Sequence, residues 1–176
     1  MRIITGRYKG RHLFTVKGKT TRPTTDYNRE MVFSMYNHYE GKRVLDLFAG
    51  TGSLGLEALS RGAVWADFVE FATPALAILL KNVSLLGCGD ICHVWRKRVK
   101  AFLKGTTDTW DVIFLDPPYN KNLINPTLGL IYERELLNEG GMVIAERSPS
   151  ETLLADFRER VIKDKEGNTN SFTLLS

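Results

Sequence analysis

Val44-Leu-Asp-Leu-Phe-Ala-Gly-Thr-Gly-Ser-Leu-Gly55 decides the fold class, because an apolar strand-like run ends here in a glycine-rich turn that leads into a helix-like segment. Gly50 and Gly52 let a ligand approach the backbone closely, and the free N–H groups at the start of the next helix suit a carboxylate or phosphate. The three glycines also fit the dinucleotide pattern G-x-G-x-x-G. The stretch therefore predicts a strand, loop and helix that hold either a dinucleotide or a methyl donor.

Two acids help to separate these ligands. Glu70 closes the next strand-like run, about 20 residues after the loop, where a carboxylate accepts hydrogen bonds from the ribose hydroxyls of either ligand. Asp46 precedes the glycines, where its charge would repel a pyrophosphate but would accept a hydrogen bond from an ammonium group. S-adenosylmethionine carries an ammonium group and no phosphate, so Asp46 favours it over NAD or a flavin nucleotide.

Strand-like and helix-like segments alternate from Arg43 onward. We expect strands near 43–48, 66–70, 91–95, 111–115 and 141–146, helices near 53–61, 73–87, 98–104 and 126–138, an earlier helix from Asp26 to about Tyr39, and two final strands at 160–163 and 171–175. This order predicts an α/β fold with a doubly wound, seven-stranded, mainly parallel sheet. In such a sheet the loops after Phe48 and Leu115 face each other across one crevice.

Asp116-Pro-Pro-Tyr119 follows the fourth of the main strands and suits methyl transfer to an exocyclic amine. The amine of a nucleobase needs acceptors for its two N–H groups, which the Asp116 carboxylate and the Pro117 carbonyl can supply. Pro117 and Pro118 fix φ and donate no hydrogen bonds, and Tyr119 offers a face on which a base can stack. These four residues are the predicted catalytic group, although the same tetrapeptide also makes an ordinary loop after a strand.

Positive charge is concentrated at the start of the chain. Residues 1–30 hold eight Lys or Arg against two acids, a net charge of +6, whereas the whole chain carries +4. We expect residues 1–24 to form a basic β-hairpin extension that contacts RNA, ahead of a methyltransferase domain over 25–176. The predicted RNA-binding residues are Arg2, Arg7, Tyr8, Lys9, Arg11, Lys17, Lys19, Arg22 and Arg29. The alternative is a solvated basic hairpin without a partner.

Several classes of protein are disfavoured. No apolar stretch reaches the length of a transmembrane helix, and the first residues lack a signal-peptide core, so we expect a cytoplasmic protein with no membrane partner. Cys88 and Cys92 are expected to be reduced thiols, and the three histidines lack a ligand spacing, so no metal is expected. At 176 residues the chain is expected to be one domain, and a monomer is the default.

Five segments together resemble the RsmD-type 16S ribosomal RNA guanine-N2 methyltransferases. They are Thr21-Arg-Pro-Thr-Thr-Asp26, Val44-Leu-Asp-Leu-Phe-Ala-Gly-Thr-Gly52, Gly55-Leu-Glu-Ala-Leu-Ser-Arg-Gly62, Phe68-Val-Glu70 and Asp116-Pro-Pro-Tyr119. The resemblance implies a class I (Rossmann-like) fold, S-adenosylmethionine as donor, and the N2 of one 16S guanine, position 966, as acceptor. It also implies a partly or fully assembled small ribosomal subunit as substrate.

The resemblance carries the donor site over residue by residue. Donor-binding positions are Asp46, Phe48, Ala49, Gly50, Thr51, Gly52, Ser53 and Leu54, with Glu70 at the ribose, Phe71 beside the adenine and Arg98 at the position where the family usually has an acid. An arginine cannot accept a hydrogen bond from the adenine amine. The alternatives left open are a DNA adenine or cytosine amino-methyltransferase, a non-catalytic RNA-binding assembly factor of the same fold, and a dinucleotide oxidoreductase.

Overall fold

The computed structural model describes residues 1–16, 26–119, 121–166 and 170–176. Their strands form one sheet in the order β3-β2-β1-β4-β5-β7-β6. The strands are β1 (Arg43–Leu47), β2 (Trp65–Val69), β3 (Cys92–Trp95), β4 (Trp110–Leu115), β5 (Leu137–Arg147), β6 (Val161–Glu166) and β7 (Ser171–Leu175). Strands β1 to β5 run parallel to one another, and β7 pairs antiparallel with both β5 and β6. The predicted doubly wound, mainly parallel sheet is confirmed.

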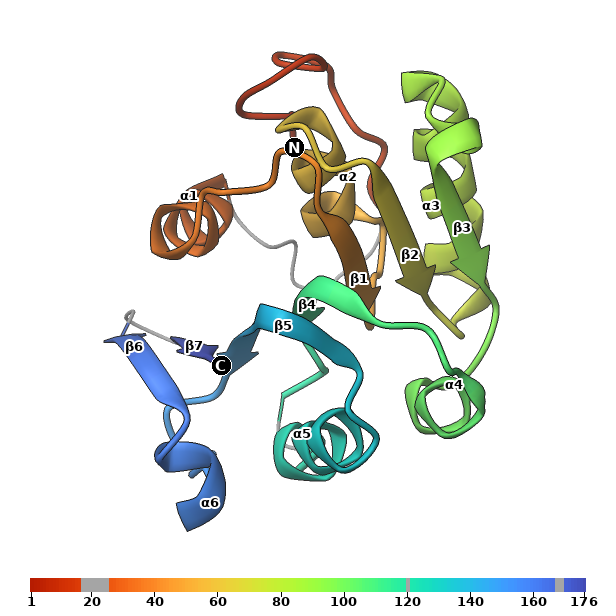
Figure 1. Ribbon diagram of the computed structural model, residues 1–176. Coiled ribbons are helices and arrows are strands. Elements are labelled where there is room, and N and C mark those ends of the chain that lie inside the picture. The colour runs from red at the N-terminus through yellow and green to blue at the C-terminus, as the bar shows by residue number, and fades with distance from the viewer. Residues whose placement is uncertain (17–25, 120, 167–169) are drawn as a thin grey trace.

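Helices cover both faces of the sheet, so the central strands are buried on both sides (Figure 1). The helices are α1 (Asp26–Met35), α2 (Ser53–Ser60), α3 (Thr73–Leu86), α4 (Val99–Gly105), α5 (Ile124–Glu133) and α6 (Ala155–Arg158), with a 3₁₀ turn at Gly89–Ile91. Side chains of α1, α2 and α3 join one apolar cluster, and those of α4 and α5 join the other. Because successive strand residues point to opposite faces, Phe114 belongs to the first cluster and Leu115 to the second.

Two predicted helices end earlier than expected. The helix predicted over 126–138 stops at Glu133, because Glu135 adopts a left-handed φ of 53° and Leu137 already enters β5. The first helix stops at Met35 instead of continuing to Tyr39. The Tyr39 ring is fully buried against Phe33 and Phe114, so packing on the sheet overrides the helical periodicity at this point.

The N-terminal segment packs on the domain and forms less sheet than predicted. Its two arms share one antiparallel bridge, Arg2 with His12, in place of two full strands. Ile3 is buried in the main core, and the backbone N–H groups of Ile4 and Thr5 donate to the Glu57 carboxylate of α2 at 2.8 and 3.0 Å. The predicted domain boundary between residues 24 and 25 lies outside the described residues.

Gly6 explains why the turn lies so close to α2. Its φ is +85°, and a Cβ at this position would stand 1.7 Å from the Ser60 carbonyl oxygen. The next residue, Arg7, donates its backbone N–H to that same oxygen at 2.9 Å. Since α2 starts beside the carboxyl end of β1 and runs back along the sheet, Ser60 and the turn lie at the amino ends of the strands (Figure 1).

Candidate active site

A cavity of 1430 Å³ lies at the carboxyl ends of β1, β2, β4 and β5, where a doubly wound sheet binds its ligands. It is lined by all four predicted catalytic residues, Asp116, Pro117, Pro118 and Tyr119, and by Asp46, Phe48, Ala49, Gly50, Thr51, Ser53, Leu54, Glu70, Phe71 and Arg98 of the predicted donor site. Gly52 lies outside this lining. Its φ is +83°, and a Cβ there would meet the Leu79 side chain at 2.3 Å, so the position serves close packing beneath the loop.

Asp46 lies at the end of β1 with 2 % of its surface exposed. Its Oδ2 accepts a hydrogen bond from the Gly55 N–H at 2.9 Å, which ties the strand to the first turn of α2. Burial raises the pKa of the Asp46 carboxyl to about 8, while the Gly55 hydrogen bond lowers it and the Glu70 charge raises it further. A cationic group entering the cavity would favour the ionised carboxylate, as expected for the ammonium of a methyl donor.

Glu70 fixes the shape of the glycine loop. Its Oε2 accepts the Gly50 N–H at 2.8 Å, and its Oε1 accepts the N–H groups of Phe71 and Ala72 at 2.7 and 2.6 Å. One carboxylate therefore ties the loop after β1 to the loop after β2. Oε1 thus has two donors and Oε2 has one, so Oε2 keeps acceptor capacity for a ribose hydroxyl.

Phe71 and Arg98 form a cation–π pair at the β2 and β3 side of the cavity. Phe71 is 49 % exposed, and the Arg98 guanidinium carbon lies 4.3 Å from the centre of its ring. Arg98 immediately precedes α4, and its backbone is extended there. A planar guanidinium over an aromatic ring is a surface on which a flat heterocycle can stack, although it offers no acceptor for an amine.

The opposite side of the cavity brings together Asp116, Tyr119 and a residue that the sequence interpretation missed, Glu146. The Tyr119 hydroxyl donates to Glu146 Oε1, and Asn170 Nδ2 donates to the same oxygen at 2.6 Å. Burial, followed by the hydrogen bond to Glu146, raises the pKa of the Tyr119 phenol above its ordinary value, so the hydroxyl remains a donor. Tyr119 is thereby held at the cavity wall before any substrate arrives.

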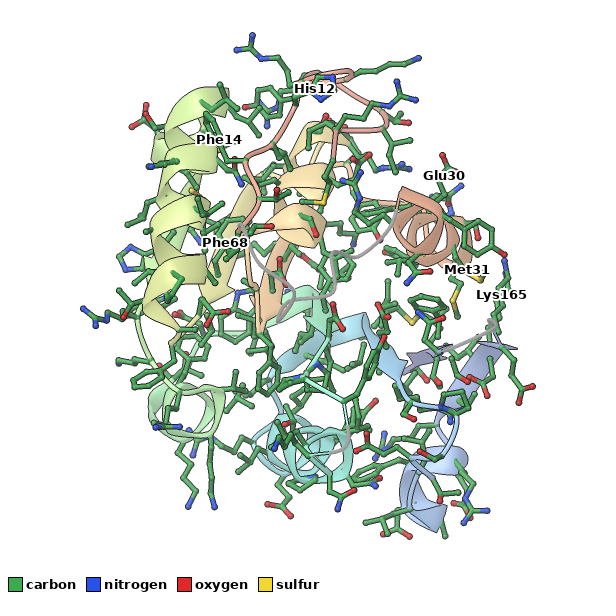
Figure 2. The ribbon with its side chains drawn as sticks, turned by 180° about the vertical axis from the view of Figure 1, so that it is seen from behind. His12, Phe14, Glu30, Met31, Phe68 and Lys165 are labelled. Carbon is green, nitrogen blue, oxygen red and sulfur yellow. The ribbon has the colours of Figure 1, made fainter. Side chains whose placement is uncertain are left out.

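Those predicted RNA-binding residues that the structure describes do not line this cavity. Arg2, Arg7, Lys9 and Arg11 are exposed around the turn at the amino ends of the strands, and Tyr8 is half-buried there. Figure 2 shows the neighbouring His12 at that end of the molecule. Lys17, Lys19 and Arg22 lie outside the described residues.

Arg29 was wrongly predicted to bind RNA. It is 0 % exposed, and its guanidinium donates to the Arg2 carbonyl and lies 3.8 Å from Glu57 Oε2. Its charge is used inside the protein, where it helps to hold the N-terminal segment on α2.

Sequence reasoning also missed several other residues of the cavity wall, among them Asn28, Lys97, Lys100 and Glu146. Glu146 could have been found, because it ends the predicted strand 141–146 and ligands bind at such ends. No group of three or more His, Cys, Asp or Glu able to hold a metal occurs in the described part of the chain. Among the same residues, no helix is long and apolar enough to cross a membrane.

Known proteins are similar to this chain in sequence and in fold. The family model "Conserved hypothetical protein 95" matches residues 1–176. "Ribosomal RNA small subunit methyltransferase D" of Haemophilus influenzae is 33 % identical over 178 residues, covering 99 % of this chain and 92 % of that protein. The same-named protein of Escherichia coli K12 is 33 % identical over 147 residues, covering 83 % of this chain and 74 % of that protein.

A solved structure extends this likeness along the chain. A hypothetical protein of Thermus thermophilus superposes with a TM-score of 0.84 at 27 % identity, covering 100 % of this chain and 99 % of that one. With the strand order and the cavity described above, these likenesses confirm the class I methyltransferase fold. The chain therefore belongs to the Conserved hypothetical protein 95 family, the family of the RsmD methyltransferases.

Proposed function

We propose that this protein transfers a methyl group from S-adenosylmethionine to the exocyclic N2 of a guanine in 16S ribosomal RNA, at the position implied by the family resemblance, 966. The observation that carries the proposal is the juxtaposition, in one cavity, of the Asp46 loop and the Asp116-Pro-Pro-Tyr119 loop. The first suits a sulfonium donor with an ammonium group, and the second suits a stacked base with an exocyclic amine.

The bound donor supplies an electrophilic methyl group on sulfur. Asp46 binds the ammonium of the donor, Glu70 its ribose, and the Phe71–Arg98 pair one face of its adenine. Asp116 and the Pro117 carbonyl accept hydrogen bonds from the two N–H groups of guanine N2, which turns the nitrogen lone pair toward the methyl carbon.

Orientation and proton removal are the main contributions of the chain. With a donor bound, a C–N bond would form as the methyl C–S bond breaks and S-adenosylhomocysteine would be the leaving product, while Asp116 would take the surplus N2 proton and pass it to water. Tyr119 stacks on the extruded base, and this stacking contributes about 1–3 kcal/mol toward the cost of unstacking it from the RNA.

The substrate is inferred to be an assembled or partly assembled small subunit, methylated by a monomer of this chain. The separation of the exposed cations at the turn from the cavity supports this inference, because one RNA surface would have to reach both ends of the sheet. Lys9 and its neighbours would then contact phosphates remote from the methylated guanine.

The test is transfer of labelled methyl from S-adenosylmethionine to small subunits purified from cells that lack this protein, followed by nuclease digestion and nucleoside analysis. We expect labelled N2-methylguanosine at a single position. Label in N6-methyladenosine or N4-methylcytidine, or in duplex DNA in preference to RNA, would contradict the proposal. Binding of the donor without transfer to subunits, naked RNA or earlier particles would favour an assembly factor.

A further inference from the structure

Glu146 stands next to Asp116 across the sheet. Leu115 pairs with Ala145 in the parallel register of β4 and β5, so the residues that follow them, Asp116 and Glu146, lie beside each other at the carboxyl ends. Both line the cavity. Two carboxylates therefore share the corner in which the proposed acceptor amine is held.

One carboxylate oxygen of Glu146 has hydrogen-bond partners, and the other is buried without one. Oε1 accepts from Tyr119 and Asn170, whereas Oε2 has no hydrogen-bond partner among the described residues. The side chain is only 4 % exposed, so water compensates little for this missing partner. Leaving a buried acceptor unsatisfied costs free energy that a bound ligand with a donor can recover.

The three bases that carry an exocyclic amine differ in whether the ring nitrogen beside it can donate a hydrogen bond. In guanine the amine lies between two ring nitrogens, and the one on the Watson–Crick edge, N1, carries a hydrogen. In adenine and in cytosine the ring nitrogen next to the amine carries a lone pair. An ionised carboxylate only accepts hydrogen bonds, so beside the amine it attracts guanine and repels the other two bases.

We propose that Glu146 is the specificity-determining residue of the acceptor site, with Oε2 accepting the N1–H of guanine while Asp116 accepts from N2. This inference rests on the proposed function and adds a reason why guanine is chosen. Tyr119 and Asn170 act as positioning residues, because their bonds to Oε1 hold the carboxylate at one orientation and leave Oε2 for the base.

The test compares guanine with 2-aminopurine, which keeps the amine but has a lone pair at N1. Each is placed at the mapped methylation position of 16S RNA reconstituted into small subunits. We expect the wild-type protein to favour guanine by about 10- to 100-fold in kcat/KM, the range of one hydrogen bond to a charged group. Glu146→Gln can offer an N–H to 2-aminopurine, so its preference should fall to about threefold or less.

Two controls keep the outcomes distinct. Glu133→Gln changes an exposed acid of α5 that lines the same cavity, and it should keep the wild-type preference. Donor affinity, measured by calorimetry, should be the same in all three proteins. An unchanged preference in Glu146→Gln overturns the inference while the proposed function stands, and so does equal use of both bases by the wild-type protein. Absence of guanine methylation by the wild-type protein overturns both.

Discussion

Asp67 and Glu146 are two carboxylates of the same sheet, each 4 % exposed, whose surroundings differ. Asp67 lies in β2 and accepts hydrogen bonds at 2.9 Å from the indole N–H groups of Trp65, Trp95 and Trp110. These are all the tryptophans of the chain. Glu146 accepts on one oxygen, and its other oxygen is buried without a hydrogen-bond partner among the described residues.

The difference separates a structural acid from a functional one. A buried carboxylate with donors on both oxygens is complete as folded, so its loss should cost stability. A buried carboxylate with one oxygen that lacks a hydrogen-bond partner is incomplete until something binds, so its loss should change recognition. Burial alone does not distinguish these roles, whereas the count of hydrogen-bond partners does.

The largest expected effect is on chemistry, in Asp116→Ala. Removing the carboxylate takes away an acceptor for the amine and for its proton, so kcat should fall by about 100- to 10,000-fold. Donor affinity should be unchanged, because Asp116 faces the acceptor. Single-turnover methyl transfer and calorimetric titration of the donor would check both. Full activity in this variant would refute the assigned role.

The second effect is on stability, in Asp67→Ala. Three indole donors, the buried one of Trp110 and the partly buried ones of Trp65 and Trp95, would lose their acceptor, and we expect the free energy of unfolding to fall by about 3–5 kcal/mol. Urea unfolding followed by circular dichroism would measure it. Asp108→Ala removes an exposed acid from the neighbouring loop and should change the free energy by less than about 0.5 kcal/mol. Similar losses in the two variants would contradict the structural role.

A third prediction concerns the pH dependence of donor binding through Asp46. The pKa of its carboxyl is about 8, and the donor ammonium requires the ionised form. Affinity should therefore rise as the pH increases from 5.5 to 7.5, by at most about tenfold per unit. Asp46→Asn should bind more weakly and lose this slope. Calorimetric titration of the donor between pH 5.5 and 7.5 would measure both affinities. If affinity changes equally with pH in the wild-type protein and in Asp46→Asn, a group other than Asp46 titrates.

A smaller effect is expected in Tyr119→Phe, which keeps the ring and removes the hydroxyl that positions Glu146. The KM for the RNA substrate should rise by about two- to tenfold, while Tyr119→Ala should raise it further because the stacking face is also lost. Steady-state kinetics with subunits as substrate would rank the three proteins. If Tyr119→Phe and Tyr119→Ala have the same KM for the RNA substrate, the ring does not contribute to binding by stacking on the base.

The smallest effect belongs to the turn at the other end of the sheet. Lys9→Ala should weaken RNA binding by about threefold and lower the slope of log affinity against log salt by about 1, without changing kcat. Lys163→Ala removes an exposed cation from β6 and serves as the matched control. Filter binding at several salt concentrations would measure the slopes. Equal slopes would favour the solvated hairpin without a partner.

The sequence predicted the parts of this molecule that follow from local pattern. Parallel strands buried on both faces, such as β1 and β4, are readable as apolar runs, and the loops at their carboxyl ends follow from the topology. Arg29 was misjudged because its burial depends on Glu57, a residue 28 positions away in the chain. The role of Asn170 was missed for the same reason, since this residue reaches Glu146 only because β7, which follows it, pairs with β5 in the folded sheet.

Because all three indoles donate to Asp67 of β2, the tryptophan fluorescence of the protein comes from a single cluster. A change in the wavelength of this intrinsic emission during unfolding therefore reports the disruption of that cluster. A tryptophan introduced at Phe71, half-exposed at the mouth of the cavity, would add a second signal with a different origin. The two emissions together would let ligand entry and loss of structure be followed in the same cuvette.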